Sequence, residues 1–126
     1  MQSVKIVLTL LLSTVTYLIG GFDMALQTMT VMIIIDYITG IMKAVNNKNL
    51  SSYLGWKGIM KKTSMFLSII VACQLERAIG QEGLIRNVVA YGFVVNEGIS
   101  ILENMDDLGI QIPLLREYLL RMKDKR

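Results

Sequence analysis

Long apolar runs separated by short polar breaks dominate the pattern of this chain. The longest of these runs extends from Met24 to Lys43, and Asp36 is the only acid in it. Twenty residues in a helix rise about 30 Å, which matches the hydrocarbon core of a bilayer. Thr39 and Gly40, like Lys43, fall on the same helical face as Asp36. The pattern predicts a membrane-spanning helix with one polar face.

Asp36 restricts how this helix can be placed. An ionised carboxylate in the middle of a bilayer costs about 2.5–3.5 kcal/mol on insertion scales. We therefore expect Asp36 to face another helix or water. This run alone leaves one alternative open, a buried helix of a soluble domain in which Asp36 meets a backbone donor.

Three further runs predict additional membrane-spanning helices, at residues 6–20, 63–79 and 84–103. The turns at Gly20–Asp23 and Gly80–Gly83 are short enough to make two antiparallel hairpins. The first run could instead be a secretory signal peptide, but it lacks a small-x-small cleavage site. The fourth run is polar enough to lie on the membrane as an amphipathic helix, which would leave three spans.

Two segments are predicted to lie at the membrane surface. Ser51 to Lys62 reads as a short interfacial segment, because Tyr and Trp favour the headgroup level and Lys reaches lipid phosphates. A plain solvated loop is the alternative. Its interface residues are Tyr53, Trp56, Lys57, Lys61 and Lys62. Residues 112–123, opened by Pro113, predict an amphipathic helix. Its apolar stripe comprises Leu114, Leu115, Tyr118, Leu119 and Met122.

The composition agrees with a membrane protein and argues against an enzyme. Hydrophobic residues make up 53% of the chain, and the mean hydropathy is +0.52. Histidine, the commonest general base and transition-metal ligand, is missing, and no phosphate loop, nucleophile elbow or zinc spacing occurs. The lone Cys73 cannot form an intrachain disulfide. We predict no enzymatic activity and no cofactor or metal.

The distribution of charge predicts the orientation. From Tyr37 to Leu75 there are five lysines and no acid. Positive residues in short loops stay in the cytoplasm, so four spans would place this segment and both termini inside. The stretch has no arginine and lies between apolar runs, so nucleic-acid binding is not expected.

Polar residues inside the predicted spans are the candidate functional residues. The candidates for a pore-lining or intramembrane polar face are Asp36, Thr39, Gly40, Lys43, Asn96, Glu97 and Ser100. In the resting state we expect Asp36 to be protonated, or paired with Lys43 or Asn96. Ser64, Ser68 and Ala72 recur every fourth residue and predict close helix packing. Four charged residues, Glu76, Arg77, Glu82 and Arg86, would gather at the outer surface.

Three motifs in order resemble the toxin-secretion/phage-lysis holin family. They are Asp36–Gly40, then Leu50–Ser52 with Gly55–Gly58 and Lys61-Lys62, then Asn96–Asn104 with Gly109 and Pro113 behind. The resemblance covers about Met29 to Leu119. It implies one membrane domain, residues 1–126, in the bacterial cytoplasmic membrane. It also implies self-association into pores that release an endolysin or a large toxin.

Two other function classes fit the same residues. A small multi-pass ion channel or transporter would use Asp36 and Glu97 to bind a cation or relay protons. A membrane adaptor would transport nothing. A neighbouring gene for a peptidoglycan hydrolase would favour a holin over both.

Overall fold

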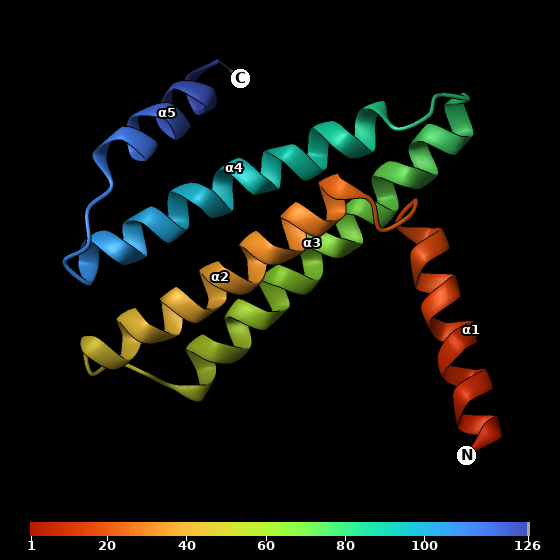
Figure 1. The fold of residues 1–126 in the computed structure, drawn as a ribbon, viewed down its shortest axis with the longest axis horizontal. Coiled ribbons are helices and arrows are strands. Elements are labelled where there is room, and N and C mark those ends of the chain that lie inside the picture. The colour runs from red at the N-terminus through yellow and green to blue at the C-terminus, as the bar shows by residue number, and fades with distance from the viewer. Residues whose placement is uncertain (126) are drawn as a thin grey trace.

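All regular elements of the described chain are α-helices, as the sequence predicts. The structure, a computed structural model, describes residues 1–125 apart from the side chain of Leu119. Leu119 of the predicted apolar stripe and the terminal Arg126 therefore lie outside the described part. The helices are α1 (Gln2–Leu18), α2 (Met24–Asn46), α3 (Ser52–Ile79), α4 (Leu84–Asp107) and α5 (Pro113–Asp124) (Figure 1).

The core lies between α2, α3 and α4. Helices α2 and α4 run in the same direction and pack along each other, while α3 runs the opposite way and packs mainly on α4 (Figure 1). The side chains of Leu26, Met29 and Ile69 are fully buried there. In α3, Met65, Ile69 and Cys73 lie four residues apart, so they form one buried stripe. This packing brings charged side chains of α2, α3 and α4 to the same level along the bundle axis.

The first expected hairpin is not a packed pair of helices. Within residues 1–125, α1 contacts only α3, and it extends away from the bundle (Figure 1). No residue of α1 is buried. Its end is attached by Arg77, which donates to the Tyr17 carbonyl at 2.6 Å and stacks on the Tyr17 ring at 4.2 Å. The apolar surface of α1 therefore packs against no other helix along its length within the described residues.

The predicted break before residue 63 is wrong, because Ser51 to Lys62 is not a separate segment. Ser51 accepts a hydrogen bond from the Leu54 amide at 3.2 Å, and α3 then continues without interruption to a left-handed Gly80. Its 28 residues span about 42 Å, more than the hydrocarbon core requires. The exposed Tyr53 and Trp56 lie in the first turns of this long helix.

Helices α2 and α3 are, within the described chain, long and apolar enough to cross a membrane. Helix α1 is apolar but has 17 residues, and the polar α4 is not among the candidates. The four-span arrangement therefore stays a prediction. The remaining helix, α5, starts at Pro113 and contacts α4, where Arg116 pairs with Asp106.

Candidate functional site

A buried group of charged side chains joins α2, α3 and α4, and we name it the lysine cluster: Asp36, Lys62 and Glu97 with Thr39 and Asn104. Lys62 Nζ forms ion pairs with both Asp36 Oδ2 and Glu97 Oε2. The side chains of Lys62, Asp36 and Glu97 are only 12%, 10% and 3% exposed. Two acids thus share one ammonium group in an otherwise apolar bundle.

An amide completes the cluster on the α4 side. Asn104 Nδ2 donates to Asp36 Oδ1 at 3.2 Å and to Thr39 Oγ1 at 3.1 Å. The Thr39 hydroxyl in turn donates to the Ile35 carbonyl at 2.9 Å. Both oxygens of Asp36 are therefore hydrogen-bonded. Removing one member of a buried charged pair costs about 3–5 kcal/mol, because its partner is left uncompensated.

The structure changes two of the predicted roles. Lys62, expected at the lipid headgroups, lies inside the bundle and is the partner of Asp36. Once α3 is continuous, Lys62 precedes Met65 and Ile69 on the buried stripe, and that spacing is the sequence signal that was missed.

The partners expected for Asp36 lie elsewhere. Lys43 forms an ion pair with Asp107, and Asn96 is exposed on another face of α4. Ser100 and Gly40 border a groove beside the cluster. Thr39 is buried and the Ser100 side chain is hydrogen-bonded to Asp36, so the fold brings four of the expected polar candidates to the lysine cluster: Asp36, Thr39, Glu97 and Ser100.

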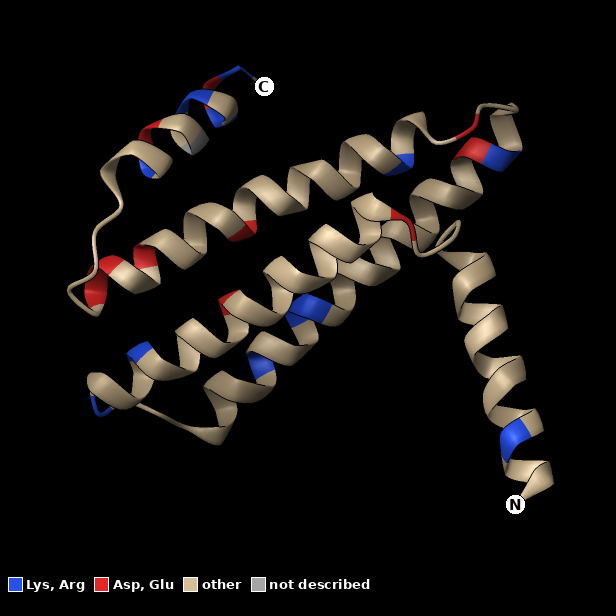
Figure 2. Cartoon of the chain, in the orientation of Figure 1, with Lys and Arg blue, Asp and Glu red and all other residues tan. Residues whose placement is uncertain are grey.

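The groove has a volume of about 340 Å³ and reaches Asp36 and Lys62. It lies between α2 and the first half of α3, next to the loop that joins them. Lysines and arginines are marked in Figure 2, which shows basic residues along α3 and at the end of α2. The expected interface residues Lys57 and Lys61 are exposed there.

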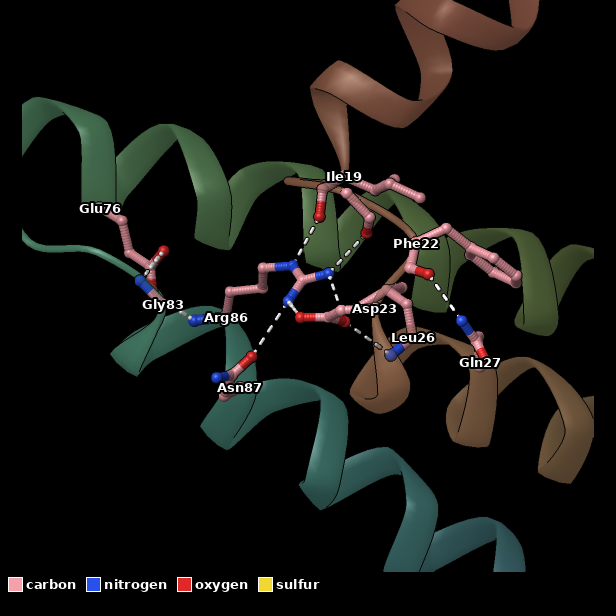
Figure 3. A network of polar contacts seen from close by, with 10 residues as sticks. Ile19, Phe22, Asp23, Leu26, Gln27, Glu76, Gly83, Arg86 and Asn87 are labelled. Carbon is pink, nitrogen blue, oxygen red and sulfur yellow. Dashed lines mark hydrogen bonds and ion pairs between the residues drawn. The ribbon is translucent and has the colours of Figure 1, made fainter.

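A second polar group, the arginine cluster, lies where α2 and α4 begin, and Figure 3 shows it from close by. Arg86 lies at its centre and is only 4% exposed. The guanidinium donates to the carbonyls of Ile19 at 2.6 Å and Gly21 at 2.7 Å, and to both oxygens of Asp23 at 2.9 and 3.0 Å. A bond to Asn87 Oδ1 at 3.0 Å uses the fifth N–H. Arg86 therefore holds the α1–α2 turn against α4.

Glu76 caps α4 from the neighbouring helix. Its carboxylate accepts from the backbone amides of Gly83 at 3.0 Å and Arg86 at 2.6 Å. The first amides of a helix lack partners inside it, and the positive end of the helix dipole favours an anion. Glu76 thus caps the start of α4. Asp23 caps α2 in the same way, because its carboxylate accepts a hydrogen bond from the Leu26 amide at 3.2 Å.

The α1–α2 turn fits closely against this cluster. Gly20 has φ +77°, and a Cβ there would lie 3.0 Å from Cys73 Sγ and 3.1 Å from Arg86 Nε. The hydrogen bond from Arg86 also holds the pKa of the Asp23 carboxyl below its ordinary value. Glu76 and Arg86, expected at the outer surface with Arg77 and Glu82, are buried, whereas the other two are exposed.

The predicted packing stripe on α3 is divided. Ala72 is buried, but Ser64 and Ser68 are exposed and bond to carbonyls of their own helix at 2.9 Å. Packing through the two serines therefore stays a prediction for contacts between copies. Among the described residues, no three His, Cys, Asp or Glu side chains lie together as a metal-binding group.

Comparisons with known proteins agree on one family. Residues 13–124 match the model of the bacteriophage holin family. An uncharacterised protein of Clostridium perfringens (strain 13 / Type A) is 39% identical over 112 residues, which cover 87% of this chain and 83% of that protein. A probable holin of Bacillus phage phi105 is 38% identical over 88 residues, or 70% and 65% of the two chains. No solved structure matches. Since the family model covers most of its length, this chain belongs to the bacteriophage holin family.

Proposed function

We propose that this protein is a holin that self-associates in the bacterial cytoplasmic membrane and opens lesions there. Family membership and the similarity to a probable phage holin support the holin role. The observation that carries the pore proposal is the lysine cluster. Charged side chains from three helices form ion pairs in the packed bundle, and the same groups would gain hydration if the helices separated around water.

The energetic argument concerns two states of the same residues. In the packed state, Lys62 compensates Asp36 and Glu97, so the bundle tolerates charge in an apolar surrounding. In a lesion, each of these side chains would face water. Because every copy contributes the same gain in hydration, the free energy that favours opening would increase with the number of copies in the assembly, and opening would be cooperative.

Helix α1 supports self-association. It is exposed along its length and finds no lateral partner within residues 1–125. Five of its polar residues share one helical face: Gln2, Lys5, Thr9, Ser13 and Thr16. A polar face on an apolar helix in lipid is satisfied by another helix or by water. We propose that this face of α1 contacts neighbouring copies.

The proposed topology has four spans. The loop between α2 and α3 and both termini lie in the cytoplasm, because lysines flank this loop, and the arginine cluster lies at the outer surface. α5 then lies at the inner face, where its basic residues meet anionic lipid. The proposed cargo is an endolysin or a toxin that leaves through the lesion.

Inducible expression in a bacterium tests the function. We expect loss of viability at a set time, followed by release of both a small dye and a cytoplasmic protein marker. Lys62→Met should change the onset, while the matched variant Lys57→Met, on the exposed face of the same helix, should not. Dye release without protein release would contradict the holin proposal.

That result would favour a small ion channel or transporter. One observation supports this second candidate, because the groove gives Asp36 and Lys62 a connection to one end of the bundle. An intramembrane acid reached from one side suits cation or proton transfer. Ion flux without a lesion would then depend on Asp36 and Glu97.

A further inference from the structure

The groove beside the lysine cluster has features that pore formation does not explain. Its volume of about 340 Å³ is that of a small ligand site. Most of its wall is apolar, from Ile41 and Ala44 on α2 to Leu50 in the loop and Leu54 on α3. Asn49 and Lys61 also border it. An apolar groove beside polar groups, at the end of a membrane helix pair, matches the two-part chemistry of a phospholipid.

The groove is open because α2 and α3 touch at few points. At one of these points the Tyr37 hydroxyl on α2 donates a hydrogen bond to the Gly55 carbonyl on α3, at 3.4 Å. A Cβ at Gly58 would lie 3.2 Å from Tyr37 Cε2, so the absence of a side chain there makes room for the ring. The Tyr37 ring forms part of the wall and holds the two helices at this distance.

The charges around the groove leave one ammonium group free. Lys43 is paired with Asp107, and Lys62 is paired with Asp36 and Glu97. Lys61 also borders the groove, is exposed, and has no ion-pair partner among residues 1–125. Lys61 is therefore the one lysine bordering the groove that has no carboxylate partner within residues 1–125, and a bound anion would supply one.

We propose that this groove binds one anionic phospholipid, with its phosphate at Lys61 and an acyl chain along the apolar wall. A zwitterionic lipid has the same chain but carries its own positive charge, so it gains less from Lys61. Inorganic phosphate has the charge but leaves the apolar wall uncovered. The proposal concerns lipid binding by the resting protein and does not depend on lesion formation.

The chain reports on this site through its single tryptophan. Trp56 lies next to Gly55 at the start of α3 and is exposed. Full-length protein is placed in phosphatidylcholine nanodiscs that contain a small fraction of spin-labelled lipid, and quenching of Trp56 fluorescence is measured. We expect spin-labelled phosphatidylglycerol to quench Trp56 more than spin-labelled phosphatidylcholine does at the same mole fraction. The difference should correspond to an enrichment of about fivefold near Trp56.

Two variants and one control separate a site from general attraction. Lys61→Gln removes the free charge, and Ala44→Phe fills the groove without a change in charge, so each should abolish the enrichment. Lys48→Gln, the same charge change in the loop outside the groove, should retain it. Circular dichroism and the elution volume show whether each variant keeps its fold.

The outcomes decide the proposal in the same nanodiscs. Loss of enrichment in Lys61→Gln and Ala44→Phe, with retention in Lys48→Gln, supports the site. Equal loss in the two lysine variants, or enrichment that survives Ala44→Phe, means diffuse attraction to a basic surface and overturns it. Displacement of the lipid by millimolar glycerol phosphate, on the order of a weak anion affinity, would mean a free phosphate site and also overturns it.

Discussion

Arg86 donates two hydrogen bonds to the carboxylate of Asp23, at 2.9 and 3.0 Å, and so joins α4 to the first turn of α2. The same guanidinium binds the carbonyls of Ile19 and Gly21. One side chain therefore satisfies three groups of a turn that lies more than sixty residues away in the sequence. The direction in which α1 leaves the bundle depends on this contact.

Replacement of Arg86 should loosen the α1–α2 turn. Arg86→Met removes the donor of the buried Ile19 carbonyl, which costs roughly 1–3 kcal/mol, and that of the partly buried Gly21 carbonyl, which costs less. Arg86→Lys should recover only part of this, because an ammonium group cannot reproduce the planar set of five donors. Unfolding of the purified protein in mixed detergent micelles measures the loss. Arg77→Met, at an exposed arginine with one bond to the end of α1, should cost less; an equal cost would contradict the role given to Arg86.

The arginine cluster should also respond to acid. The hydrogen bond from Arg86 lowers the pKa of Asp23 in the folded protein, so the stabilisation is present above the unfolded pKa, near about 4, and is lost as the pH falls through the lower folded value. The thermal midpoint of the wild-type protein should therefore change little from pH 7 to pH 5 through this group and fall below about pH 4.

Asp23→Asn provides the control for this acid response. The amide keeps the cap of α2 and removes the charge, so part of the fall below about pH 4 should be missing. Because Asp23 is half exposed, solvent screens the pair and the difference should be small. Identical pH profiles for the two proteins would show that another carboxyl group causes the acid response.

The lysine cluster allows stability and lysis to be separated. Lys62→Met leaves Asp36 and Glu97 buried without a cation and should destabilise the bundle by about 3–5 kcal/mol. The triple variant Lys62→Met, Asp36→Asn, Glu97→Gln has no charge left in the lysine cluster and should regain most of that stability. If the charged groups line a lesion, the triple variant should still fail to release a cytoplasmic protein. Lysis on the wild-type schedule would limit the cluster to a packing role.

Much of this fold follows from local sequence. Apolar runs and short glycine turns place α2 and α4 within a few residues, and Pro113 marks the start of α5. The beginning of α3 was missed because the polar residues after Ser51 suggested an interface, although Ser51 itself is the cap of a continuous helix. The wrong location predicted for Lys62 follows from that error, since its place on the buried stripe is visible only when the helix extends back past residue 63.

The remaining features depend on distant contacts. Glu76 caps a helix that begins after the next turn, and Arg86 meets Ile19 from the other end of the sequence. Periodicity gives the face of a residue but not the neighbour that this face meets. The divergence of α1 from α2 likewise could not be predicted, because nothing in the short turn itself fixes the angle between the two helices.

The proposed topology predicts which positions can be labelled from outside. In a Cys73→Ala background, a membrane-impermeant thiol reagent added to intact cells should label Gln81→Cys, in the α3–α4 turn. It should spare Asn47→Cys and Lys125→Cys until the membrane is permeabilised. Both cytoplasmic positions follow from the lysine-rich segment and four spans. Labelling of Lys125→Cys in intact cells would instead mean three spans, with α4 lying on the membrane.

The polar face of α1 should lie between copies. In the Cys73→Ala background, Thr9→Cys or Ser13→Cys places a thiol on that face, whereas Leu11→Cys places one on the opposite face of the same helix. Oxidation in the membrane should give disulfide-linked dimers for the first two variants and little for the third, because a disulfide requires Cα atoms within about 7 Å. Equal cross-linking at Leu11 would mean random collision, and no cross-linking would mean that this face meets water or another helix. Thr9→Leu with Ser13→Leu should then delay lysis if the contact between copies limits its onset.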